Sequence, residues 1–326
     1  MCSNVAIPRP GRAPASQKTI PGPTEATFTS TFGTLLPPAQ FLDTANGKAA
    51  YYEILPISPP ASGNRALDKV LFIHGVQTPA IGMLPLARAL HKSFPHAHFA
   101  LVDLWGHGLS DTPILPHDPS IFHSLIDALL DQLRWPSAHL VGFSFGGALA
   151  IGYTISRSSK VRSYTLVAPA GLIPSSSLTS DDLAKLRGDD DAVAKKWAFE
   201  WLEGGELVVP ENWKERVAKG EVVAKAVKEW EIREHPGHMA SVAAIVRDGG
   251  IFDADAEFVE AVKGQVPGLA IIGALDSVCS KEYLERVGFG DIVVVPEIGH
   301  EVVRERVPEV AGSICEFWSK LGDSSD

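Results

Sequence analysis

Short apolar runs alternate with longer helical patterns along most of this chain. The runs lack polar alternation, which is typical of strands covered on both faces in a parallel sheet. They fall at residues 69–75, 98–108, 138–147, 163–171, 268–276 and 291–300, and helical patterns occupy residues 80–94 and 119–134 and begin again at 146. This order of strand and then helix predicts an α/β fold whose parallel strands are joined by helical crossovers.

The first part of the chain departs from this rhythm. Residues 1–27 are rich in Pro, Ala and Gly and have no periodicity, so they predict a flexible N-terminal arm. Two extended stretches then flank Asn46-Gly47, a dipeptide typical of a type I′ turn, in which both central residues need a positive φ. An antiparallel hairpin is therefore expected to open the sheet.

A second departure is the interval from 173 to 265, which has charged amphipathic patterns and no clear strand. A crossover needs only about a dozen residues, so the surplus predicts an inserted helical cap (lid) on a core formed by 28–172 and 266–326. Four of the seven tryptophans fall in the cap, at positions 197, 201, 213 and 230. Trp197 and Trp201 share a helix face. They are expected either to fix the cap to the core or to line an apolar substrate chamber.

Net charge limits the partners. The 326 residues carry a net charge of −10 without a cluster of Lys and Arg, which argues against nucleic acid or an anionic membrane as a partner. No apolar run approaches the roughly 20 residues that span a bilayer. A small molecule is the expected partner. A cap can also pair subunits, so a homodimer is among the expectations.

The cysteines and histidines argue against a disulfide framework and against a metal site. Three widely spaced cysteines favour a reducing compartment, so we expect a cytoplasmic protein. The N-terminal segment is rich in Pro and poor in acidic residues, so a transit peptide for import into an organelle is the alternative. His96 with His98, and His235 with His238, lack acidic or cysteine companions at ligand spacing, so they are interpreted as surface or site-lining residues. No cofactor and no metal is expected.

Candidate chemistry begins with "HLVGFSFGGALAIGY", residues 139–153, where Ser144 lies between a predicted strand and a predicted helix. A strand that leads through G-x-S-x-G into a helix makes a sharp turn with the serine at its apex. Glycines at 142, 146 and 147 are needed because side chains there would collide with the strand and the helix. The helix N-terminus favours negative charge that develops on a substrate oxygen.

Serine is a poor nucleophile at neutral pH, so this interpretation requires a histidine base and an acid that orients it. His300 and Asp276 each follow a predicted strand, at the sheet edge where ligands gather in open α/β sheets. The chain order Ser144, Asp276, His300 is the one that this strand arrangement requires. These three residues are the predicted catalytic triad.

An oxyanion hole is the remaining requirement. Its predicted donors are the amides of Phe145, directly after the nucleophile, and of Val76, in the loop after the strand that ends at His74 and Gly75. His74 and Gln77 are predicted to lie at the substrate site, as are the cap residues Trp197 and Trp201. Phe143 and Phe145 flank the serine with apolar bulk and are expected to help select a hydrophobic substrate.

Five short pieces carry a family resemblance: "HG" at 74–75, "DLWGHGLSD" at 103–111, "GFSFGG" at 142–147, "GALD" at 273–276 and "GH" at 299–300. Together they resemble the α/β-hydrolase superfamily over residues 40–322. The resemblance implies a mostly parallel, twisted sheet with helices on both faces and an inserted helical cap. It also implies a structural role for Asp103. His74 and His107 each lie beside a glycine near a strand end, and they are interpreted as residues that orient the loops of the site. Relatives that place aspartate at the turn are disfavoured by Ser144.

The predicted function is a serine hydrolase, an esterase or lactonase, that cleaves a carboxylic ester or lactone with an apolar moiety through an acyl-enzyme. Two alternatives stay open. One uses the same triad for carbon–carbon bond hydrolysis or for lyase or cyclase chemistry. The other is a non-catalytic small-molecule receptor, which would have no need of a base beside the serine.

Overall fold

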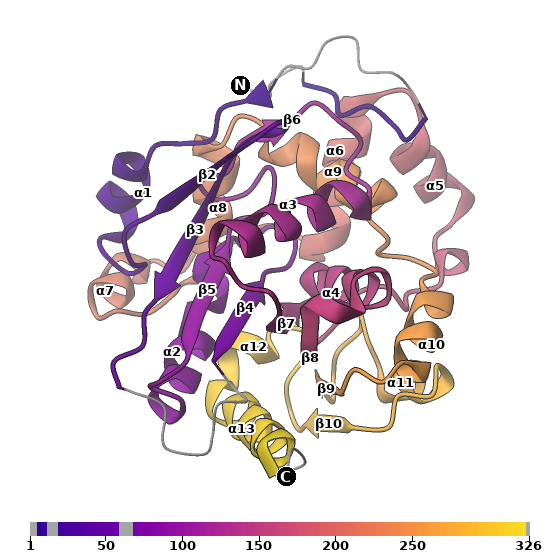
Figure 1. Cartoon of the computed structure of the whole chain (residues 1–326). Helices are drawn as coiled ribbons and strands as arrows, with labels where there is room; N and C mark the ends of the chain where they lie inside the picture. Colours follow the sequence, from indigo (N-terminus) through magenta and orange to yellow (C-terminus); the bar gives the residue numbers. More distant parts are fainter. Residues whose placement is uncertain (1–4, 12–18, 59–67, 324–326) are drawn as a thin grey trace.

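The structure is a computed structural model that describes residues 5–11, 19–58 and 68–323 (Figure 1). An eight-stranded sheet forms its centre, in the order β10-β9-β8-β7-β4-β5-β3-β2. Its strands are β2 (Gln40–Thr44), β3 (Gly47–Ile54), β4 (Lys69–Ile73), β5 (His98–Val102), β7 (Ala138–Phe143), β8 (Val161–Val167), β9 (Gly268–Gly273) and β10 (Ile292–Val295). Only β2 and β3 are antiparallel to their neighbours, so the predicted parallel sheet with an N-terminal hairpin is confirmed.

Helices cover both faces of the sheet. One face carries α2 (Leu84–Ser93) and α13 (Val307–Asp323), and the other carries α3 (Pro119–Gln132), α4 (Phe145–Ser156) and α10 (Asp255–Lys263). Successive side chains of β4 alternate between the two resulting cores, with Leu71 in one and Phe72 in the other. Both are fully buried, which explains why this strand has no polar alternation. Within the described ranges, no helix is long and apolar enough to cross a bilayer.

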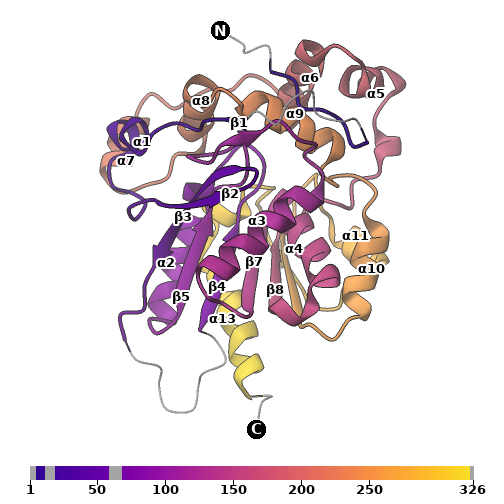
Figure 2. The ribbon, with the colours of Figure 1, turned by 45° about the horizontal axis from the view of Figure 1, so that its top comes forward.

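Most of the remaining helices come from the part of the chain between β8 and β9. They lie beyond one end of the strands, and α13 and the C-terminus lie at the opposite end (Figure 2). These helices are α5 (Ser180–Arg187), α6 (Asp191–Glu203), α7 (Trp213–Ala218), α8 (Ala224–Glu234) and α9 (His238–Asp248). Helix α10 comes from the same interval but packs on α4. Amphipathicity does not tell which surface a helix covers, so the limit at 265 predicted for the cap stays a prediction. Helices α5 to α9 are called the cap below.

Short elements complete the chain. They are the helices α1 (Glu25–Phe32), α11 (Lys281–Arg286) and α12 (Val302–Glu305), the 3₁₀ turns η1 (Ala80–Met83), η2 (Ser158–Lys160) and η3 (Ser175–Ser177), and a separate two-stranded pairing of β1 (Thr19–Ile20) with β6 (Thr112–Pro113).

The described part of the predicted flexible arm is packed against the cap. Ile7 is buried against α9. It is an isolated apolar residue without periodicity, which is why the sequence pattern did not indicate this contact. Helix α1 begins inside the predicted arm, at Glu25, and just beyond the arm's predicted limit Phe28 and Phe32 contact Trp230 of α8. Residues 1–4 and 12–18, and with them Cys2 and most of the segment considered for targeting, lie outside the described residues.

The hairpin turn lies one residue earlier than predicted. Thr44 pairs with Gly47, so the central residues are Ala45 and Asn46, and of this segment only Gly47 has a positive φ, at 133°. The Thr44 hydroxyl accepts a hydrogen bond from the Asn46 amide and donates one to the Gly47 carbonyl. This side-chain bridging stabilises the shifted turn, and the predicted type I′ geometry is wrong.

Candidate active site

Ser144 lies at the apex of the turn between β7 and α4, with φ 52° and ψ −118°. A non-glycine residue rarely adopts this region, and holding it there costs on the order of 1–3 kcal/mol. The neighbouring glycines make the turn sterically feasible. A Cβ at Gly142 would lie 2.3 Å from the Gly146 carbonyl oxygen, one at Gly146 would lie 2.1 Å from that of Ile73, and one at Gly147 would meet Pro169 at 2.8 Å. The predicted reason for all three glycines is confirmed.

The structure brings Ser144, His300 and Asp276 into one hydrogen-bonded chain. Nε2 of His300 is 2.9 Å from the Ser144 hydroxyl, and Nδ1 is 3.1 and 3.2 Å from the two oxygens of Asp276. The Asp276 carboxylate also accepts the amides of Val278 and Cys279, which fix its orientation. Because a carboxylate only accepts, Nδ1 carries the proton and Nε2 faces the serine as an acceptor. This is the arrangement of a nucleophile, a base and an orienting acid.

The two predicted oxyanion donors are backbone amides of chain segments that lie beside the serine. Phe145 begins α4 directly after the serine, so its amide has no partner within the helix. The chain carrying Val76 passes close to the serine, since a Cβ at Gly75 would lie 2.9 Å from Cβ of Ser144. Neither amide has an acceptor in the described part of the chain. The positive end of the α4 dipole adds to the preference for negative charge here.

A family model described as the alpha/beta hydrolase fold matches residues 68–201, which include Ser144 and the loops before it. Over these residues the chain is similar to that family, and its fold is the α/β-hydrolase fold. Asp276 and His300 lie outside the matched range, so the prediction that they form a triad with Ser144 is supported by the distances given above and not by the family model.

One curated relative and two solved structures are similar to this chain. The dihydrolipoyllysine-residue acetyltransferase component of an acetoin cleaving system from Pseudomonas putida is 26% identical over 222 residues, which cover 67% of this chain and 55% of that protein. An esterase from Exiguobacterium antarcticum superposes with a TM-score of 0.64 at 18% identity, covering 86% of this chain and all of that one. An enol-lactonase from Burkholderia xenovorans gives 0.63 at 17%, with the same coverage. At these identities the solved structures establish a shared fold.

The predicted substrate contacts of His74 and Gln77 are not seen. His74 is fully buried, and its Nδ1 donates to the Gly75 carbonyl while Nε2 accepts the Leu104 amide. Burial lowers the pKa of His74 to about 4, so it stays neutral. Gln77 is 3% exposed, and its backbone amide donates to Nε2 of His107 at 3.2 Å. Both residues hold the loop that carries Val76.

The two phenylalanines beside the serine have different roles. Phe145 is fully buried: its ring packs edge-on against Phe122, and a Cβ added at Gly249, at the end of α9, would lie 3.0 Å from it. Its side chain therefore does not select a substrate. The Phe143 ring lies 5.2 Å from the His300 ring and carries the Arg304 guanidinium 4.9 Å from its centroid. Phe143 thus packs against the imidazole of His300.

Trp197 and Trp201 stack on each other, with ring centroids 5.8 Å apart. Trp197 donates its indole N–H to Asp182 of α5, and Trp201 packs on Phe252, which bridges to Ile173. These contacts fix the cap to the chain that leaves β8. Among the described contacts, none joins either tryptophan to the triad directly.

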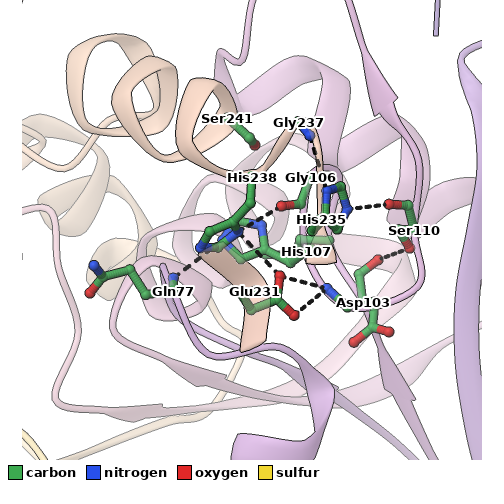
Figure 3. Close-up of polar contacts among 12 residues, drawn as sticks. Gln77, Asp103, Gly106, His107, Ser110, Glu231, His235, Gly237, His238 and Ser241 are labelled. Atoms are coloured by element: carbon green, nitrogen blue, oxygen red, sulfur yellow. Dashed lines mark hydrogen bonds and ion pairs between the residues drawn. The ribbon is translucent and has the colours of Figure 1, made fainter. Parts of the chain in front are cut away.

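A buried polar network next to the site was missed by the sequence analysis (Figure 3). His235 and His238 are 2% and 1% exposed, so their interpretation as surface or site-lining residues is wrong. Glu231 is fully buried beside them, and Nδ1 of His238 lies 3.2 Å from its carboxylate. The available signal was the short spacing of these residues: Glu231 lies in the last turn of α8, His235 is its C-cap and His238 begins α9. No group of three or more acidic, His or Cys side chains within the described ranges is arranged to hold a metal.

Proposed function

We propose that this protein is a serine hydrolase that cleaves a carboxylic ester or lactone with an apolar moiety. The observation that carries the proposal is the chain of contacts from Asp276 through His300 to Ser144, next to two unpaired amides. A receptor without turnover would need neither a strained serine nor a base on it.

The chemistry follows from these positions. The Ser144 oxygen attacks the acyl carbonyl while Nε2 of His300 takes the hydroxyl proton, and Asp276 stabilises the resulting imidazolium. The amides of Phe145 and Val76 donate to the oxygen that becomes negative. His300 then gives its proton to the leaving alkoxide as the C–O bond breaks. Water, deprotonated by His300, attacks the acyl-enzyme and releases the acid and the free serine.

The apolar-substrate part of the proposal rests on the segment that follows β8 and passes beside the serine. The Ser144 carbonyl accepts the Ala170 amide at 2.9 Å, which places the next residues beside the nucleophile. Those residues are Gly171, Leu172 and Ile173, and Ile173 bridges to Phe252 under the stacked tryptophans. Leu172 is fully buried and Ile173 is 9% exposed, so these residues give the serine apolar surroundings, and we infer from them a preference for substrates with an acyl chain or a ring.

The test combines a covalent probe with a substrate panel. A fluorophosphonate should attach to Ser144, and p-nitrophenyl esters of increasing acyl length and a series of lactones should be hydrolysed. Ser144→Ala should abolish labelling and turnover while the thermal unfolding temperature stays unchanged, and Ser175→Ala in the exposed η3 turn is the matched control. Turnover that survives in Ser144→Ala would overturn the assignment.

The same panel separates the rival reactions. Vinylogous 1,5-diketones test for carbon–carbon bond hydrolysis, and thioesters supplied with an acceptor alcohol or thiol test for acyl transfer, the reaction in the name of the acetyltransferase relative. Preferential turnover of either class would replace ester or lactone hydrolysis as the function of this triad.

A further inference from the structure

The loop formed by residues 103–111, here called the junction loop, lies between the cap and the chain that carries the oxyanion-hole amide (Figure 3). Four cap side chains bind its backbone. Glu231 accepts the Gly108 amide at 3.0 and 3.2 Å, His238 Nδ1 donates to the Gly106 carbonyl at 2.9 Å, His235 Nε2 donates to the Ser110 carbonyl at 2.8 Å, and Ser241 donates to the Trp105 carbonyl at 3.0 Å. All four are buried, so the junction loop is fixed to the cap in a water-poor environment.

The fit between the loop and the cap is tight. Gly106 has a φ of 75°, and a Cβ there would lie 2.2 Å from Cβ of Ser241. A displacement of α8 or α9 would therefore move the junction loop rather than slide across it.

On its other side the junction loop binds residues 74–80. His107 accepts the Gln77 amide on Nε2 at 3.2 Å, Asp103 accepts the Ala80 amide at 2.9 Å, and His74 accepts the Leu104 amide at 2.9 Å. Val76 lies inside this span, one residue before Gln77. The predicted oxyanion donor is thus held from the junction loop on both sides.

His107 is the part of this link that depends on one protonation state. Its Nδ1 donates to the Trp105 carbonyl at 3.1 Å, so Nε2 is the acceptor nitrogen and the ring is neutral. Its ring lies between those of His238, at 4.8 Å and 86°, and His74, at 5.1 Å. Burial holds the pKa of His107 well below its usual range, and His238 and His74 add to this effect.

The Gln77 backbone needs such a partner. Its φ of 69° lies in a region that a side chain other than glycine rarely adopts, at a cost of about 1–3 kcal/mol. A backbone in this state persists only where its surroundings over-determine it. Without the His107 acceptor, the Gln77 amide would also be a buried donor without a partner.

We propose that His107, held from the cap by His238 and Glu231, is a positioning residue that fixes the backbone of Gln77 and so aims the Val76 amide at the oxyanion. The role rests on the proposed function for its effect on catalysis. It couples the cap to the oxyanion hole, because the same loop binds α8 and α9 on one side and residues 74–80 on the other.

A second buried histidine supplies a matched control. His117 is fully buried like His107, donates Nδ1 to the carbonyl two residues earlier, and packs edge-on against Phe122. Its Nε2 has no hydrogen-bond partner in the described structure. His107→Leu and His117→Leu therefore remove the same local contacts, and only His107→Leu removes an acceptor from the 74–80 backbone.

The experiment compares His107→Leu, His107→Gln and His117→Leu in the full chain, with the p-nitrophenyl ester that the wild type turns over fastest. We expect His107→Leu to lower kcat by about tenfold to a hundredfold at unchanged KM, less than the ~10²–10³-fold for losing an oxyanion donor outright. His107→Gln, whose Oε1 can replace Nε2 as acceptor, should recover most of kcat. A His107→Leu kcat within about twofold of that of His117→Leu would overturn the proposal.

Hydrogen exchange gives a readout that does not depend on turnover. Peptides covering residues 74–80 should exchange faster in His107→Leu and at the wild-type rate in His117→Leu and His107→Gln. Unchanged exchange in His107→Leu would overturn the positioning role even if every variant lost activity. Accelerated exchange in a protein that hydrolyses no ester would support the positioning role and refute the proposed function instead.

Discussion

Two histidine–carboxylate pairs lie within this molecule, and they are built almost alike. Nδ1 of His300 is 3.1 Å from Asp276, and Nδ1 of His238 is 3.2 Å from Glu231. Both carboxylates are fully buried. The imidazoles differ, because a quarter of the His300 side chain is exposed and only 1% of the His238 side chain is.

Exposure changes what each pair can do. Burial raises the pKa of Glu231 well above its usual range and lowers the pKa of His238 to about 3, so burial disfavours the charged form of both groups. That pair binds the backbone of the junction loop from the cap side. His300 can reach solvent and Ser144, so an imidazolium formed there is hydrated and stabilised by Asp276. The same two groups thus form a candidate catalytic base at His300 and a structural contact at His238.

Replacing each carboxylate by its amide should show the largest difference in kcat between the two pairs. Asp276→Asn favours the wrong imidazole tautomer, and we expect kcat to fall on the order of 10³- to 10⁴-fold, or about 5 kcal/mol of barrier. Glu231→Gln still offers an acceptor to the Gly108 amide, so its kcat should fall by less than about tenfold. Steady-state kinetics on one ester decides the matter, and equal losses in the two variants would contradict it.

The exposed pair could be predicted from the sequence, and the buried pair could not. Asp276 and His300 each follow an apolar strand, and the carboxyl ends of parallel strands meet at one edge, so local patterns were enough. Glu231 and His238 meet the junction loop only through packing of distant segments, which no periodicity reports. The direction of a side chain could not be predicted from the sequence either. The apolar residues that flank Ser144 suggested that Phe145 faces the substrate, but the first turn of α4 directs it into the core.

Acid should destabilise the fold through the buried imidazoles. Burial lowers the pKa of His74 and His235 to about 4 and that of His238 to about 3, against about 6.5 in the unfolded chain. Below pH 6.5 the unfolded state therefore binds more protons, so the free energy of unfolding falls as pH decreases. We expect a loss of about 2 kcal/mol for each imidazole between pH 7 and 5. Glu231 acts in the opposite direction, since its folded carboxyl binds a proton first.

Urea unfolding at pH 7, 6 and 5 measures this dependence. His235→Gln, whose amide can still donate to the Ser110 carbonyl, should reduce the slope because it removes one titrating group. A free energy of unfolding that is flat over this range would show that these imidazoles are not held neutral by the fold.

Removing each imidazole separates stability from catalysis. His238→Leu leaves the Gly106 carbonyl and the Glu231 carboxyl short of a buried donor, and we expect a loss of about 2 kcal/mol in the free energy of unfolding. His300→Leu should cost less than about 1 kcal/mol, because the site is partly exposed and Asp276 keeps the amides of Val278 and Cys279. Urea unfolding at pH 7.5 gives both values. A larger loss in His300→Leu would reverse the assignment of the two pairs.

The support beneath His300 should have the smallest effect. Phe143 packs its ring on the imidazole and also carries the Arg304 guanidinium, whereas His238 is held by backbone groups and Glu231. Phe143→Leu keeps apolar bulk but loses the ring contacts, which are worth about 0.5–1.5 kcal/mol, so kcat should fall about threefold. KM and the unfolding midpoint serve as internal controls and should change little. A kcat loss as large as that of Asp276→Asn would mean that the orientation of His300 depends on packing more than on its carboxylate.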